Sequence, residues 1–409
     1  MKMSGADAFV RVFKGFGVAH MFGLPGDSLG LYDAIFRDGT IQHVLVRHEQ
    51  AASHMADAYA RVSGRVGVCD ASSGPGVTNL VTGLATAHAD SIAVIAIAST
   101  SPTPIRQRAN FQELDQRALL APVTKAVIEI DNPARIPELV KRAFRIATTG
   151  RPGPVVLNVP MDVYLAPAEF ADDAFDCDAR FGAFPAMRVR PQEGETQRVM
   201  ELLAGAKKPV LWCGGGVITA GASAEVQAFA EATGIPVATT YMGKGALPEA
   251  HPLSLGTAGL LGRPVTNKYL ADVDLVLAVG TRFTNVDTAN WNVPKRGTKI
   301  IQIDIDPSEL GKNYDAIHSV WGDAKLFMAE LLAACQAGGL QEARRGTRSR
   351  SDPERMARRT RPGLPAGDAE RRGAGPSASG HARAARRHEA GGYPGLRFRF
   401  QSDLGRPVL

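Results

Sequence analysis

The sequence predicts an α/β protein: two doubly wound parallel-sheet domains followed by a disordered tail. Short apolar runs alternate with helical patterns along residues 1–335, and this alternation stops abruptly beyond them. Strands that alternate with helices pair in parallel, because each helix carries the chain back along the sheet. The 409 residues, 44% of them hydrophobic, suffice for two or three domains.

The first domain is predicted to span residues 1–165. Its strand-like runs are VLVR, VGVCDA, SIAVIAIAS and PVVLNVP, and they alternate with helical patterns such as Glu49–Val62. Residues 166–192 are rich in Pro, Ala, Asp and Phe with weak periodicity, so we expect a linker. The second domain, residues 193–335, has the strand runs PVLWCG, PVATTY, LVLAVG and KIIQIDI, which again predict a doubly wound sheet.

The composition changes in the last predicted region, residues 336–409. Over residues 341–409, 42 of 69 positions are Arg, Gly, Ala or Pro, and the segment has 16 Arg but no Lys. A segment with so few large apolar residues cannot bury enough surface to offset its chain entropy, so we expect disorder. The arginine-only basic content and the sudden loss of pattern favour an out-of-frame translation of a GC-rich gene.

Charge and composition argue against several classes of protein. The net charge of +6 comes from the tail, since residues 1–340 carry a net charge of −3, so we expect no nucleic-acid partner. No apolar run approaches the roughly 20 residues that span a bilayer, and the N-terminus lacks a signal-peptide pattern, so we expect a cytoplasmic protein with no membrane partner. The four cysteines lie far apart without metal-ligand spacing, so we expect no protein-held metal.

Glu49 is the most informative candidate for a site residue. It follows the predicted strand at residues 41–46 and begins a helix, at the strand end where open α/β sheets bind ligands. For an isolated sequence, an acid favoured by the helix dipole would be the simpler explanation. Two glycine-rich turns favour a binding role: Gly23-Leu24-Pro25-Gly26-Asp27, and the stretch SSGPGVTN from Ser72 to Asn79. Their glycines let the backbone approach a flat ligand.

The stretches RHEQAASHMADAYARVSG, SSGPGVTNLVTGLATAHADSIAVIAI, FQELD and GRPGPVVLNVPMDV resemble the pyrimidine-binding domain of the acetolactate synthase family of thiamine-diphosphate-dependent enzymes. The resemblance covers nearly all of residues 1–165. It implies that Glu49 hydrogen-bonds N1′ of the thiamine aminopyrimidine and favours its imino tautomer. The imine then removes the thiazolium C2 proton before attack on a 2-keto acid such as pyruvate.

The same resemblance implies further residues around the cofactor and substrate. Pro25, Gly26, Gly74 and Asn79 would border the pyrimidine, and Phe111 and Gln112 would lie near the substrate. Lys125 matches a lysine of the same region. For Phe111 a core aromatic is the competing interpretation, and for Lys125 a solvated charge.

The second domain resembles the central domain of the same family through IPVATTYMGKGALPEAHPLSLG, LVLAVGTRF, IIQIDIDPSELGKN and WGDAKL. In acetolactate synthases this domain carries a structural FAD. The contacts implied here are Gly280, Thr281, Arg282, Asp304, Asp306, Gly322 and Asp323. Relatives with this central fold bind ADP or no nucleotide. The sequence GTRFTNVDTANW also lacks the acidic pair and the basic residue that usually follow the Phe in acetolactate synthases, so FAD, ADP and an empty site all stay open. Gly214-Gly215-Gly216 lacks the full GxGxxG pattern, and a plain turn is expected.

The family completes its cofactor site with a third domain, in which a Gly-Asp-Gly motif and a later Asn hold Mg²⁺ and the diphosphate. The nearest sequences here, Gly322-Asp323-Ala324 and Gly367-Asp368-Ala369, lack the second glycine. Loss of the reading frame or a third domain on a separate polypeptide would explain this. We therefore expect a 2-keto-acid carboligase or decarboxylase that is inactive as an isolated chain, with a homo-oligomer as the family's assembly. The alternatives are a catalytically silent FAD- or ADP-binding protein and a decarboxylase of another acyl substrate.

Overall fold

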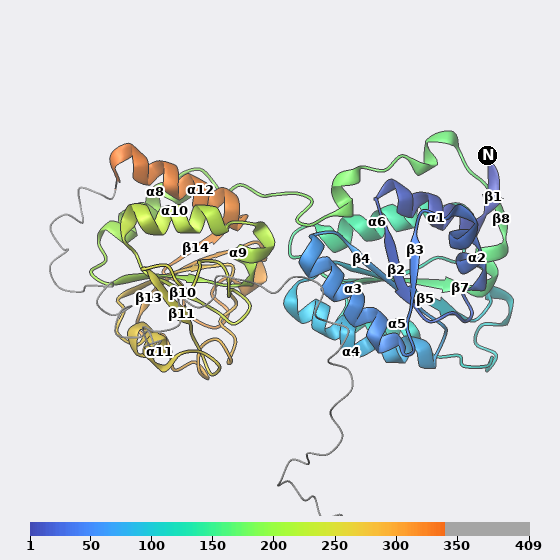
Figure 1. The fold of residues 1–409 in the computed structure, drawn as a ribbon, viewed down its shortest axis with the longest axis horizontal. Helices are drawn as coiled ribbons and strands as arrows, with labels where there is room; N and C mark the ends of the chain where they lie inside the picture. The colour runs from blue at the N-terminus through green and yellow to red at the C-terminus, as the bar shows by residue number, and fades with distance from the viewer. Residues whose placement is uncertain (340–409) are drawn as a thin grey trace, which may run out of the picture. The chain divides into compact units, whose positions relative to one another are not determined.

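The computed structural model describes residues 1–339; beyond residue 339, the tail predicted from the sequence lies outside the described residues. Two six-stranded parallel sheets dominate the fold, and helices cover both faces of each sheet (Figure 1). The predicted α/β class with two doubly wound domains is confirmed.

The first domain has the strand order β3-β2-β4-β5-β7-β6, and every neighbouring pair is parallel. Its strands are β2 (His20–Gly23), β3 (Gln42–Leu45), β4 (Gly67–Ala71), β5 (Val94–Thr100), β6 (Ala126–Glu129) and β7 (Val155–Pro160). One face is covered by α1 (Gly5–Gly15), α2 (Leu29–Asp38), α6 (Ile136–Thr148) and α7 (Met161–Leu165). The other face is covered by α3 (Glu49–Ser63), α4 (Pro75–Asp90) and α5 (Gln116–Leu120).

Local sequence explains why α3 and α4 lie where they do. Ala52, Ala56 and Ala60 recur every four residues, so α3 presents one small apolar face to the sheet, and it ends at Gly64, whose φ is 69°. Pro75 occupies the start of α4, where its missing N–H costs nothing. Both helices therefore begin at the carboxyl edge of the sheet.

The segment expected to be a linker carries structure of its own. Residues Pro167–Glu169 form β8, which pairs antiparallel with β1 (Lys2–Ser4). Three aromatic residues, Phe170, Phe175 and Phe181, are buried in the core of the first domain. The first part of residues 166–192 therefore packs on the first domain through isolated aromatic side chains, which give no periodic pattern.

The central domain has the strand order β11-β10-β9-β12-β13-β14, all parallel. Its strands are β9 (Pro209–Cys213), β10 (Val237–Thr239), β11 (Ser254–Thr257), β12 (Leu275–Val279), β13 (Lys299–Asp304) and β14 (His318–Trp321). Helices α8 (Glu195–Ala204), α9 (Gly215–Ala220), α10 (Ser223–Thr233) and α12 (Ala324–Ala334) cover one face, and α11 (Pro264–Leu270) lies on the other. A helical turn at Cys335–Gly339 follows α12.

Within residues 1–339, none of the helices has the length and apolar character needed to cross a membrane.

Candidate functional site

Glu49 begins α3 and is only 7% exposed. The side-chain amide of Asn79, on α4, donates a 2.9 Å hydrogen bond to Glu49 Oε2. A Cβ atom at Gly76 would lie 3.2 Å from Glu49 Oε1, so the glycine keeps space beside that oxygen. Among residues 1–339 no donor hydrogen-bonds Oε1, which leaves it available to a ligand.

The second glycine turn is held by groups that approach its backbone closely. Gly74 has φ 62° and ψ −109°, and a Cβ there would lie 2.2 Å from the carbonyl oxygen of Gln112. The Gly74 N–H donates to Oε1 of Gln116, which is 2% exposed. Gln116 Nε2 donates in turn to Asn158 Oδ1 and to the Ser99 carbonyl. The turn therefore has room for glycine alone at position 74.

The first glycine turn is bonded to the second. A Cβ at Gly26 would lie 1.6 Å from Ser72 Oγ. The Asp27 N–H donates to the same Ser72 Oγ at 3.0 Å, and the N–H and hydroxyl of Ser73 donate to Asp27 Oδ2 at 2.9 and 2.6 Å. The predicted border residues Pro25, Gly26, Gly74 and Asn79 are thus brought to one edge of the sheet.

The residues predicted near the substrate divide into two groups. Phe111 is 80% exposed, so the core interpretation of this aromatic is wrong. It lies beside Gln112, whose φ is 61° and whose backbone packs on Gly74. Lys125 is not a solvated charge, because its Nζ donates to the carbonyls of Ile146, Thr149 and Arg151. Burial and the neighbouring Arg151 lower the pKa of Lys125 to about 8.

A cavity of about 380 Å³ lies at the carboxyl ends of β9, β10, β12, β13 and β14. Six of the seven residues predicted to contact a nucleotide line it: Gly280, Thr281, Arg282, Asp304, Gly322 and Asp323. Small-molecule sites span roughly 300–1,000 Å³, so a nucleotide-sized group fits. Gly215 and Gly216 also line the cavity. The Gly216 N–H donates to the Gly280 carbonyl at 3.0 Å, so close packing of two backbone segments accounts for a glycine at position 216, and no dinucleotide motif is needed.

The acids at this cavity differ in what occupies their oxygens. Asp323 caps α12 and accepts two 2.8 Å contacts from Arg188, so its carboxylate is engaged within the protein. Asp304 is 8% exposed and accepts the Asp306 N–H. Burial raises the pKa of Asp304 to about 6, and the charges of Asp306 and Glu309 act in the same direction. Asp304 is the acid best placed to accept a ligand hydroxyl.

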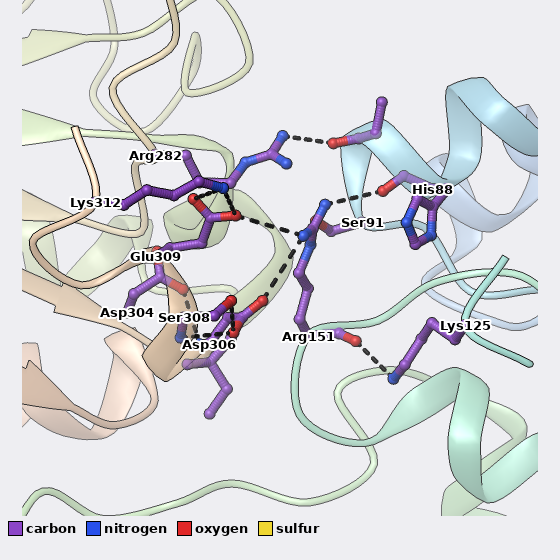
Figure 2. Close-up of polar contacts among 12 residues, drawn as sticks. His88, Ser91, Lys125, Arg151, Arg282, Asp304, Asp306, Ser308, Glu309 and Lys312 are labelled. Atoms are coloured by element: carbon purple, nitrogen blue, oxygen red, sulfur yellow. Dashed lines mark hydrogen bonds and ion pairs between the residues drawn. The ribbon is translucent and has the colours of Figure 1, made fainter. Parts of the chain in front are cut away.

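Arg151 connects the loop before β7 to the acids that follow β13 (Figure 2). Its Nε and Nη2 donate to Ser91 Oγ and the His88 carbonyl, while Nη1 lies 3.7 Å from carboxylate oxygens of Asp306 and Glu309. Arg282 Nη2 also donates a hydrogen bond to the carbonyl of Ala89. Asp306 is therefore paired with a side chain of the first domain.

The sequence matches two family models. Residues 3–119 match the thiamine pyrophosphate enzyme N-terminal TPP binding domain, and residues 196–331 match the thiamine pyrophosphate enzyme central domain. The chain belongs to the thiamine pyrophosphate enzymes. The matched segments contain Glu49, both glycine turns and the central cavity's strand ends.

Curated relatives of the chain include acetolactate synthases. A probable acetolactate synthase large subunit of Methanocaldococcus jannaschii is 44% identical over 336 residues, which are 81% of this chain and 56% of the relative. Acetolactate synthase of Arthrospira platensis is 42% identical, over 81% of this chain and 58% of the relative. The acetolactate synthase large subunit of Corynebacterium glutamicum is 42% identical, over 82% of this chain and 53% of the relative. The chain spans about half the length of these relatives.

Gln116 and Arg151 are not assigned to the site from sequence, and Asp27 is named only as part of the first glycine turn. Gln116 and Arg151 lie in stretches quoted for the resemblance or next to them, but nothing in a single sequence indicates their partners. Asp27 follows Pro25-Gly26, and an acid after such a turn was the one available signal. No group of three or more His, Cys, Asp or Glu suited to a metal ion occurs in the described part of the chain.

Proposed function

We propose that this chain supplies the pyrimidine-binding part of a thiamine-diphosphate-dependent 2-keto-acid carboligase or decarboxylase of the acetolactate synthase type. The observation that carries the proposal is Glu49: a buried carboxylate, oriented by Asn79, with one oxygen available beside a glycine. The residues present fit the aminopyrimidine, because an acid and close-approaching backbone suit a flat heterocycle with a ring nitrogen.

When bound, thiamine diphosphate supplies the carbon nucleophile and the electron sink for decarboxylation of a keto acid. The contribution of this chain would be proton transfer and orientation. Glu49 Oε1 would hold or release a proton at N1′, while the Asn79 amide keeps Oε2 fixed. Gln112 and the exposed Phe111 would face the keto acid, for which pyruvate is the expected substrate.

We further propose that the central cavity binds FAD, or ADP in its place. Thr281 and Asp304 offer a hydroxyl and a buried carboxyl for ribose or amide groups, and Arg282 offers a guanidinium for a diphosphate. Gly216 and Gly280 pack closely on each other, and both line the cavity. Asp306 and Asp323 are less suited to this role, since Arg151 and Arg188 already pair with them.

Turnover by this 409-residue chain alone is not expected in this proposal, since the resemblance assigns Mg²⁺ and the diphosphate to a motif that the sequence does not contain. Charge-assisted bonds of this kind contribute roughly 1.5–3 kcal/mol each, so losing several weakens binding by orders of magnitude. Assembly into a homo-oligomer belongs to the same proposal.

The test is a fusion of residues 1–339, in frame, to the remaining C-terminal part of the Arthrospira platensis relative. Pyruvate consumption that requires thiamine diphosphate and Mg²⁺ and falls at least 100-fold in Glu49→Gln supports the proposal. A matched control is Glu138→Gln, an exposed acid paired with Arg135. Equal turnover in Glu49→Gln and the unaltered fusion would refute the role of Glu49.

Two alternatives remain distinguishable by thermal shift of the full chain. A catalytically silent nucleotide-binding protein would be stabilised by FAD or ADP and unaffected by thiamine. A decarboxylase of another acyl substrate would share the thiamine response, and the fusion would then decarboxylate a different keto acid in preference to pyruvate.

A further inference from the structure

Asp70 is a carboxyl group at the centre of a buried strand. It lies in β4 with no exposed surface, next to Cys69 and Ala71. Ser28 Oγ donates to its Oδ2 at 3.0 Å, and the Tyr32 hydroxyl lies 2.8 and 2.6 Å from Oδ1 and Oδ2. An acid in an otherwise apolar strand is costly to bury, and the proposed chemistry of Glu49 does not use it.

Asp70 contacts both ends of the first glycine turn. A Cβ at Gly23, where the turn begins, would lie 1.6 Å from Asp70 Oδ1 and 2.8 Å from the Tyr32 hydroxyl. Ser28, at the other end, is the N-cap residue of α2, and Tyr32 lies one turn further along that helix. The turn therefore rests directly on the pair formed by Asp70 and Tyr32.

The contacts continue from this turn to Glu49. Asp27 bonds to Ser72 and Ser73, which follow Asp70 at the end of β4. The next residues start α4, whose Asn79 hydrogen-bonds Glu49. Asp70 thus contacts the first turn directly and lies two residues before Ser72, where the second turn begins.

The groups that act on Asp70 are neutral or acidic. Burial raises its pKa to about 7, the hydrogen bonds from Tyr32 and Ser28 oppose this rise, and the charge of Glu49 on α3 adds to it. Burial raises the pKa of Tyr164, on α7, which also interacts with Asp70.

The outer neighbour of this cluster is a histidine whose charged form is disfavoured by burial. His43, on β3, meets the Tyr32 ring edge-on at 4.5 Å, and burial lowers the pKa of this histidine. The charge of Asp70 therefore changes near neutral pH without a cation among these neighbours to offset it.

We propose that Asp70 is a positioning residue for the pyrimidine site, and that its ionised form favours binding of the cation thiamine there. The proposal rests on the proposed function. An ionised carboxylate accepts stronger hydrogen bonds from Ser28 and Tyr32 than a protonated one, so it holds the first turn more firmly. Thiamine carries a permanent positive charge on its thiazolium ring, so a nearby negative charge favours its binding.

The pH dependence of thiamine binding follows from linkage. Because the ligand prefers ionised Asp70, its affinity rises as Asp70 loses its proton, and bound thiamine makes Asp70 more acidic by the same factor. We expect the association constant of the full chain for thiamine to rise about three- to tenfold between pH 6 and pH 8, a factor set by a coupling of the usual allosteric size.

Isothermal titration with thiamine, without diphosphate or metal, tests this. In Asp70→Asn the affinity should not change with pH over this range. In Tyr32→Phe, which removes a hydrogen bond that favours the ionised form, the midpoint of the rise should move to higher pH. Asp57→Asn, which alters another buried acid of the first domain, paired with Arg61, should keep the wild-type profile.

Hydrogen exchange of the segment 22–28 provides a measurement that needs no ligand. After correction for intrinsic exchange, wild type should be better protected at pH 8 than at pH 6, and Asp70→Asn should show no such difference. If wild type binds thiamine with a profile equal to that of Asp70→Asn, the positioning role is wrong while the proposed function stands. If wild type binds no thiamine at any pH, the proposed function fails, and equal exchange in the two proteins then refutes the role of Asp70 as well.

Discussion

Asn79 and Glu49 are joined by a 2.9 Å hydrogen bond that links the first turns of α3 and α4. Helix α3 follows β3 and α4 follows β4, and β2 lies between these two strands in the sheet, so this bond fixes the carboxylate relative to the second glycine turn. The amide donates to Oε2 and leaves Oε1 for another partner.

Replacing this donor with an acid should make stability depend on pH. In Asn79→Asp two carboxyl groups would share one short contact, which raises the pKa of the pair. A raised folded-state pKa gives stability that is present at low pH and lost as pH rises, so the free energy of unfolding should fall by about 2 kcal/mol between pH 4 and pH 7, each pKa unit being worth 1.36 kcal/mol. Asn79→Ala, measured by urea unfolding in the same buffers, should lack this added slope, and an equal slope would contradict the assigned contact.

Gly74→Ala should be far more costly than an alanine at an open glycine. Position 74 combines a φ of 62° with a Cβ contact of 2.2 Å to the Gln112 carbonyl. Gly39 has a similar φ of 71° but nothing within 4 Å, so Gly39→Ala should cost only the left-handed conformation, about 1 kcal/mol. Denaturant unfolding should show at least about 3 kcal/mol for Gly74→Ala. Equal costs would mean that the turn relaxes freely.

The strands that sequence predicted best are those buried on both faces. The runs at β4, β5 and β7 are buried along their whole length and mostly apolar, as expected where helices cover both sides of a parallel sheet. The half-exposed edge strand β14 and the short β2 were not named, because HSVW and HMFG mix polar and apolar residues over four positions. In the structure the turn at residues 23–27 follows β2 directly, and α1 ends before β2 begins.

From the sequence, a site residue could be predicted only where its type and its place at the end of a predicted strand already pointed to ligand binding. Glu49 and the glycines stand at strand ends, which a strand-helix pattern reveals. Asp70 accepts a hydrogen bond from Ser28 and Gln116 accepts one from the Gly74 N–H, each from a residue 42 positions away, and no local pattern reports such contacts. Asp70 lies within a mostly apolar run, so the local pattern predicts a buried strand and gives no sign of a site.

The buried Asp304 should give the central domain a pH dependence of its own. Its pKa is raised to about 6, so the folded protein binds a proton that the unfolded chain releases near pH 4. Protonated Asp304 therefore stabilises the folded protein at low pH, and this stabilisation is lost as pH rises from about 4 to about 6. Asp304→Asn should flatten thermal stability across that interval relative to wild type. An unchanged slope would show that Asp304 is ionised throughout.

Arg151→Ala should destabilise the chain by about 2 kcal/mol. The variant removes donors from Ser91 and the His88 carbonyl and leaves Asp306 and Glu309 without their nearby guanidinium. Arg135→Ala is the control, because its pair with Glu138 is exposed and should contribute less than about 0.5 kcal/mol. Similar losses in both variants, measured by thermal unfolding, would contradict the structural role given to Arg151.

The central claim is that Glu49 receives the aminopyrimidine of thiamine, and titration of thiamine into the full chain tests it most directly. Wild type should bind saturably, and Glu49→Ala should bind at least tenfold more weakly, equivalent to about 1.4 kcal/mol, while Glu138→Ala binds as wild type does. Circular dichroism of the variants should be unchanged. Equal affinity in wild type and Glu49→Ala, or no binding by wild type, would contradict the account.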